Sequence, residues 1–225
     1  MRFATSDFAQ DGVCVCNAAV PASRTLELRN LSVFRSGNRP GARAFRVSRE
    51  VEWLIEAGGT LANLATTLMG VQVRAIRVLY FDKTPEMNWA VPWHQDRTIA
   101  VTDRMEMPGF GPWSMKAGVH HVEPPQTILQ SILSLRLHLD DCAADNGPLM
   151  VVGGSFRLGR VPSQQIKRHV ENGSIRICCA KAGDVVAMRG LTIHASERAS
   201  RPGHRRVLHV DFSATDLPGG LQWAL

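Results

Sequence analysis

Two short apolar segments near the carboxyl end of the chain decide the fold class. Residues 191–196 read LTIHAS and residues 205–210 read RRVLHV. Both favour β structure, and the residues between them include Gly and Pro, so we expect two neighbouring antiparallel strands. Similar short segments recur upstream and predict further strands at residues 71–82, 89–101, 117–122, 132–140, 148–152, 175–180 and 184–188.

Helices are expected mainly before this β-rich part. Pro21 is well placed to open a helix over residues 22–34, and residues 48–68 carry apolar side chains at helical spacing in two segments. We also expect a strand at residues 12–16 and a helix at residues 163–170. Many short strands without alternating long helices argue against a parallel α/β sheet and favour a sandwich or barrel.

The length of 225 residues predicts a single domain. In this domain residues 1–70 form a mostly helical layer and residues 71–215 form the β core. Hydrophobic residues make up 44% of the chain and charged residues 20%, which excludes general disorder. The net charge of +6 indicates an anionic partner, but the positive residues are spread along the chain, which disfavours nucleic acid.

The apolar stretches are shorter than the ~18 residues that a membrane span needs, and the first residues lack a signal-peptide profile. The five cysteines are odd in number and contain no C-x-x-C pair. Neither a disulfide framework nor a structural zinc site is therefore indicated, and we expect a cytoplasmic protein.

The stretch WHQDR at residues 93–97 carries the first chemical signal. Side chains two apart on a strand share a face, so His94 and Asp96 can converge on one ion. His194, in the apolar segment quoted first, can supply a second imidazole. Two histidines and a carboxylate form the facial triad of non-haem Fe(II) oxygenases, which leaves coordination positions open for a co-substrate and O2. Arg205, eleven residues beyond His194, can return on the next strand and bind a carboxylate.

Taken together, the motifs resemble the phytanoyl-CoA dioxygenase family of Fe(II)/2-oxoglutarate-dependent oxygenases. They are HQD at 94–96, LHLDD at 137–141, NGPL at 146–149, GS at 154–155, GD at 183–184 and Arg205. The resemblance implies a double-stranded β-helix of the jelly-roll kind, which agrees with the strands expected above.

The resemblance also assigns residues. It implies that His94, Asp96 and His194 bind Fe(II), that Arg205 pairs with the distal carboxylate of 2-oxoglutarate, and that Ser196 contacts the same group. Because a carboxylate is present at Asp96, hydroxylation is favoured over halogenation.

Two further co-substrate positions of the family match less well. The position on the strand before the H-x-D motif is Leu79 here, and a tryptophan position falls at Arg136. This second departure leaves open which residues hold the other end of 2-oxoglutarate.

The candidate substrate contacts are Lys83, Asn88, Trp113 and His138. Arg136 and His138 alternate with leucines and share one strand face, which points either into the barrel or to solvent. Lys83 and Asn88 precede the H-x-D strand and can contact either the substrate or 2-oxoglutarate, with a solvated loop as the alternative. Trp113 lies in the Gly- and Pro-rich residues 105–125, which form either a lid over the substrate or a segment packed on the barrel.

The sequence thus predicts an Fe(II)- and 2-oxoglutarate-dependent dioxygenase that hydroxylates a small molecule and releases succinate and CO2. The alternatives are a nonenzymatic jelly-roll binding or sensing module, and a nucleic-acid demethylase on the same scaffold. A zinc hydrolase with the same three ligands is also possible, but it leaves Arg205 and Ser196 unexplained. Neither the substrate nor the oligomeric state is indicated.

Overall fold

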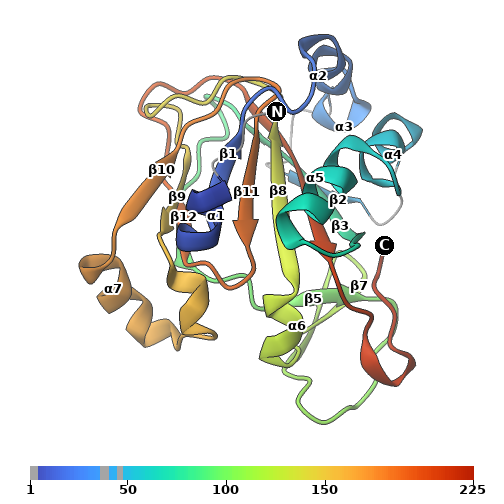
Figure 1. The fold of residues 1–225 in the computed structure, drawn as a ribbon. Coiled ribbons are helices and arrows are strands. Elements are labelled where there is room, and N and C mark those ends of the chain that lie inside the picture. The colour runs from blue at the N-terminus through green and yellow to red at the C-terminus, as the bar shows by residue number, and fades with distance from the viewer. Residues whose placement is uncertain (1–4, 36–40, 45–47) are drawn as a thin grey trace.

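Three antiparallel sheets form most of the protein in the computed structural model, which describes residues 5–35, 41–44 and 48–225 (Figure 1). In spatial order, the large sheet contains β1 (Val13–Cys16), β11 (Val185–Arg189), β8 (Ile132–His138), β13 (Arg205–Ser213), β3 (Arg74–Lys83) and β2 (Gly41–Ala44). The second sheet contains β10 (Ile175–Cys178), β9 (Leu149–Val152), β12 (His194–Ser196) and β4 (Val91–His94). A small third sheet contains β5 (Ile99–Val101), β7 (Val119–Val122) and β6 (Trp113–Lys116).

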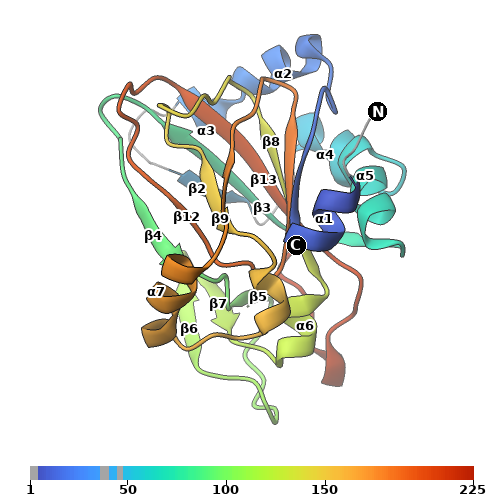
Figure 2. The same cartoon turned by 60° about the vertical axis from the view of Figure 1, so that its left-hand side comes forward.

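Five helices lie in the N-terminal part of the chain: α1 (Thr5–Asp11), α2 (Ala22–Arg29), α3 (Ser32–Arg35), α4 (Arg49–Ile55) and α5 (Thr60–Met69). Later come α6 (Gln126–Gln130), α7 (Ser163–Asn172) and two short 3-10 helices, Ser155–Leu158 and Pro218–Gly220. Figures 1 and 2 show α4 and α5 on one side of the large sheet, and β9 and β12 on the other. The mainly β fold with N-terminal helices confirms the predicted class.

Alternation along β8 separates the two faces of the large sheet. Leu133, Leu135 and Leu137 are fully buried and pack with the apolar side chains of α4 and α5. Each such leucine contributes roughly 1.5–3 kcal/mol through burial. Since successive strand residues point to opposite faces, Arg136 and His138 point between the sheets. The helical layer therefore leaves the other face of this sheet for a polar site.

Several expected elements differ in detail. The segments at residues 191–196 and 205–210 give β12 and β13, but these strands lie in different sheets and do not pair with each other. The helix predicted at residues 22–34 is interrupted after Arg29, where Asn30 adopts a non-helical capping role and its N–H donates to Glu27 O at 3.0 Å. The strand predicted at residues 89–101 is two strands, β4 and β5, separated by residues 95–98. The Gln95 amide causes this separation, because it donates to Leu191 O and Gly159 O and accepts from Val161 N, outside any strand ladder.

Six short elements were missed: α1, β2, β6, α6 and the two 3-10 helices. Strand β6 has an exposed face and a sequence, WSMK, without regular apolar alternation, so only its pairing with β7 defines it. Among the described residues, the helices all fall short of the length and apolar character needed to cross a membrane.

Candidate active site

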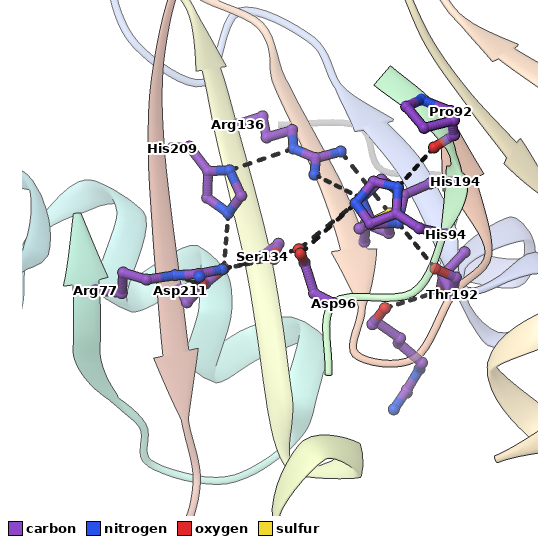
Figure 3. Close-up of polar contacts among 12 residues, drawn as sticks. Arg77, Pro92, His94, Asp96, Ser134, Arg136, Thr192, His194, His209 and Asp211 are labelled. Atoms are coloured by element: carbon purple, nitrogen blue, oxygen red, sulfur yellow. Dashed lines mark hydrogen bonds and ion pairs between the residues drawn. The ribbon is translucent and has the colours of Figure 1, made fainter. Parts of the chain in front are cut away.

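His94, Asp96 and His194 come together where β4 meets β12. The two histidines are directly paired across these antiparallel strands, and Asp96 is the second residue after the end of β4. One ligand atom from each residue lies within 4.8 Å of the others. The Asp96 carboxylate oxygens lie 3.8 Å from Nε2 of His94 and 3.9 Å from Nε2 of His194 (Figure 3).

Backbone carbonyls fix the orientation of both imidazole rings. Nδ1 of His94 lies 2.8 Å from Pro92 O, and Nδ1 of His194 lies 2.9 Å from Thr192 O. Because a carbonyl only accepts hydrogen bonds, each Nδ1 carries the proton and each Nε2 presents a free lone pair. This outer contact is typical of metal-binding histidines and leaves both Nε2 atoms facing Asp96.

The protonation states also suit a metal site. Burial, assisted by the positive charge of Arg136, lowers the pKa of His194 to about 3 against the opposing effect of Asp96. Burial disfavours the ionised form of Asp96, but His194 and Arg77 outweigh it and hold the pKa of this carboxyl below its usual value. A neutral imidazole and an ionised carboxylate are the forms that bind a metal, so this donor set fits Fe(II).

A cavity of about 220 Å³ extends from the three ligands between the two larger sheets. Its far end is polar and includes Ser196 and Arg205. Its walls are largely apolar and are formed by Leu79, Phe81, Trp89, Val91, Leu149 and Val207.

Two cations meet at the far end of this cavity. Arg205 on β13 pairs in register with Lys83 on β3, which is only 1% exposed. The Lys83 ammonium donates to Ser196 Oγ at 3.2 Å and to Glu197 O at 2.9 Å. Arg205 donates from Nη1 to Gly147 O, while its buried Nε has no hydrogen-bond partner among the described residues. Burial, and then the nearby Arg205 charge, lower the pKa of Lys83 to about 8, so this end favours an anion.

The structure therefore places Lys83 beside Ser196 and Arg205, the predicted co-substrate residues. Leu79, Arg136 and His138 all line the cavity. The polar face of β8 therefore points into the barrel and not to solvent.

Two of the predicted substrate contacts lie elsewhere. The Asn88 side chain exchanges two hydrogen bonds with the backbone of Ala199, both of 2.8 Å, and so braces a loop. Trp113 packs in a satellite apolar cluster with Ile99 and Val122, beneath Arg104, so the packed alternative holds for this residue.

Sequence reasoning missed four polar or aromatic residues that line this cavity, Arg77, Phe81, Trp89 and His209, and also the buried Asp211, which contacts His209. His209 and Asp211 lie two and four residues after Val207 on the same predicted strand. Because side chains two apart on a strand point the same way, this spacing indicates that they face the same side as Arg205. Nothing comparable marks Trp89, which lies outside the strands and stacks its ring 5.2 Å from the Lys83 ammonium.

Comparisons with known proteins agree with this site. The profile of the phytanoyl-CoA dioxygenase family (PhyH) matches residues 42–207. No curated protein matches the sequence.

Several solved structures share the fold. The non-heme alpha ketoglutarate dependent carbocyclase SnoK from nogalamycin biosynthesis is 15% identical, with a TM-score of 0.71 over 95% of this chain and 83% of that one. EctD from S. alaskensis, solved with 2-oxoglutarate and 5-hydroxyectoine, is 19% identical, with a TM-score of 0.68 over 93% and 74%. The epimerase SnoN, solved with Fe3+, alpha ketoglutarate and nogalamycin RO, is 16% identical, with a TM-score of 0.68 over 96% and 89%.

The family profile covers most of the chain and includes all three candidate iron ligands, Ser196 and Arg205. The chain is therefore an enzyme and not a nonenzymatic binding module, and its cofactor and co-substrate are iron and 2-oxoglutarate. This chain belongs to the phytanoyl-CoA dioxygenase family and is a 2-oxoglutarate-dependent dioxygenase.

Proposed function

We propose that this protein hydroxylates a C–H bond of a small molecule, using Fe(II), O2 and 2-oxoglutarate and releasing succinate and CO2. The observation that supports this reaction is one cavity with the His94–Asp96–His194 triad at one end and a buried cationic end at the other. Iron bound at the triad would supply the oxidising chemistry. The chain itself binds, orients and shields the reactants.

The far end of the cavity suits the distal carboxylate of 2-oxoglutarate. The planar fork of Arg205 can donate to both oxygens, Lys83 adds a second positive charge, and the Ser196 hydroxyl is already within 3.2 Å of that ammonium. Leu79 lines the same cavity and contributes apolar surface for the methylene groups of the co-substrate. In the part of the chain that the structure describes, the hydrogen bonds of Lys83 and Arg205 go to a hydroxyl and to backbone carbonyls, so a dicarboxylate bound here would neutralise two buried cations.

The apolar walls serve the reaction by excluding water. Phe81, Trp89 and Val207 surround the space between the triad and Arg205. In such a space, charge–charge contacts are stronger than in water and side reactions with solvent are suppressed. The free cysteines support a cytoplasmic location, and a single-domain cytoplasmic enzyme is part of this proposal.

Anaerobic titration with Fe(II) and 2-oxoglutarate tests the function directly. The wild-type protein is expected to develop a visible charge-transfer band and, on admission of O2, to form succinate. His94→Ala should lose both signals because it removes an iron ligand, whereas His169→Ala, on the outer helix α7, should keep them. A folded wild-type protein with no band would refute the proposal, and a Zn(II)-dependent hydrolase in particular would give none, because Zn(II) is redox-inactive.

Lys83 gives the co-substrate affinity a characteristic pH dependence. Its pKa of about 8 in the free protein means that Lys83 is charged below that pH and becomes neutral above it. A bound carboxylate favours the charged form and so raises this pKa. We therefore expect the affinity for 2-oxoglutarate to be constant below about pH 8 and to fall by up to about tenfold per pH unit above it.

The measurement is the dissociation constant of 2-oxoglutarate for the Fe(II)-loaded protein as a function of pH, without O2. Lys83→Met should bind more weakly at neutral pH and lose the decline at alkaline pH. An identical alkaline decline in Lys83→Met would show that another group causes it.

A further inference from the structure

Arg136 lies directly beside the metal ligands. Its Nη2 donates to Nε2 of His194 across 3.5 Å, the nitrogen lone pair that a bound metal would take (Figure 3). Metal binding therefore removes the acceptor of this N–H group. It also leaves a guanidinium beside a divalent cation, which is unfavourable unless an anion lies close to both.

Among the described residues, no carboxylate forms an ion pair with Arg136. Its remaining contacts are Nε to Nδ1 of His209 at 3.5 Å and Nη1 to Sδ of Met188 at 3.9 Å. Of the two nearby acids, Asp96 is a metal ligand. Asp211 is already bound by Arg77 at 2.5 Å, by the Ser134 hydroxyl at 2.5 Å and by His209 at 2.7 Å.

A chain of buried contacts fixes the direction of the Arg136 side chain. Asp211 accepts from Nε2 of His209, because a carboxylate can only accept, so the neutral ring carries its proton there. Nδ1 of His209 is then an acceptor and receives the Nε–H of Arg136. Burial lowers the pKa of His209 in spite of Asp211, which agrees with a neutral ring. With Nε engaged, Nη1 and Nη2 are left to face the cavity.

The register of the large sheet sets the pattern of charges along the cavity. Arg205 on β13 lies opposite Lys83 on β3. The next inward residue of β13, Val207, lies between Phe81 and His138 on the two neighbouring strands. The third, His209, lies between Leu79 and Arg136. Burial, together with Arg205 and Arg136, lowers the pKa of His138 to about 3, so this ring is neutral. The cavity thus presents a cationic row, an uncharged row and a second cationic residue beside the metal ligands.

We propose that Arg136 binds the carboxylate of 2-oxoglutarate that lies next to the iron, so that this enzyme holds both ends of its co-substrate with arginine. The inference rests on the function proposed above and deepens it. A five-carbon diacid with an apolar middle matches the charge pattern of the cavity. Its iron-side carboxylate supplies the anion that Arg136 needs once the metal occupies Nε2 of His194. His209 and Asp211 act as positioning residues for this contact.

Two ligands and two variants separate the ends of the co-substrate. 2-Oxoglutarate has both carboxylates, whereas 2-oxobutyrate keeps the 2-oxo acid end and lacks the distal carboxylate. Loss of one charge-assisted hydrogen bond corresponds to a weakening of about 10- to 100-fold. Arg136→Gln should weaken both ligands by such a factor, and Arg205→Gln should weaken 2-oxoglutarate alone. Arg189→Gln, which removes an arginine stacked on Phe8 outside the cavity, should change neither.

The readout is ligand binding to the Fe(II)-loaded protein without O2, followed by the charge-transfer band, with Fe(II) affinity measured in parallel. Affinities of Arg136→Gln within threefold of the wild type would overturn the inference, as would a loss confined to 2-oxoglutarate. Arg136→Met provides a second variant whose side chain suits the neighbouring Met188 if the glutamine variant does not fold. Failure of the wild type itself to bind Fe(II) and 2-oxoglutarate would refute the proposed function, whereas normal wild-type binding with no effect at Arg136 would refute only this assignment.

Discussion

Asp96→Asn is expected to lower the affinity for Fe(II) by more than about 100-fold and to abolish succinate formation. Loss of a contact that only supports a metal ligand already costs about 10–100-fold, and this variant removes a ligand charge itself. The amide has nearly the same size as the carboxylate, so the fold should persist. Asp211 also continues to bind Arg77, which lies 3.8 Å from Asp96.

The measurements for Asp96→Asn are Fe(II) binding by competition with a chelator and thermal unfolding of the metal-free protein. Asp82→Asn is the matched control, because Asp82 is likewise paired with a histidine, His204, at 3.0 Å, but does not line the cavity. Unchanged Fe(II) affinity in Asp96→Asn would exclude this carboxylate as a ligand.

Arg205→Gln should produce the largest effect on the co-substrate. Truncation of one member of a buried, hydrogen-bonded charge pair costs about 2–5 kcal/mol, which corresponds to a weakening of roughly 30-fold or more. The KM for 2-oxoglutarate should rise accordingly. By contrast, kcat at saturating 2-oxoglutarate should change less, because the iron ligands remain in place.

The neighbouring residue offers a close control for Arg205→Gln. Arg206 points to the opposite side of β13, where its guanidinium pairs with Asp140 at 2.8 Å, so Arg206→Gln should leave the KM for 2-oxoglutarate unchanged. Steady-state kinetics with varied 2-oxoglutarate distinguishes the two variants. Equal KM values for Arg205→Gln and Arg206→Gln would contradict the assignment of Arg205.

The candidate metal site could be predicted because its determinants are local. The two-residue spacing correctly indicated that His94 and Asp96 lie together, although Asp96 lies beyond the end of β4, and His194 lies in a segment whose strand character is plain from composition. The fold class followed from the same kind of signal, since short apolar segments separated by turns recur through most of the chain. Elements without such a signal, β6 and α6 among them, became visible only through their tertiary contacts.

Sequence periodicity alone established that Arg136 and His138 share a face of β8, but it left open whether that face meets solvent. The answer depends on where α4 and α5 pack, because these helices bury the leucine face and leave the polar face inside the barrel. The position of Lys83 beside Ser196 likewise depends on contacts between residues 113 positions apart in the chain.

The sequence by itself thus predicted the mainly β fold and, from residue type and spacing, His94, Asp96 and His194 as candidate iron ligands, while the roles of Ser196 and Arg205 were implied by the family resemblance. Only the tertiary structure decided the direction of Arg136, the neutral state of His209 and the second cation at the co-substrate end. These features depend on side chains from β3, β8 and β13 that meet across the sheet register. Burial then shifts the pKa values of these side chains. Neither the contacts across the sheet nor the burial can be read from any one segment of the chain.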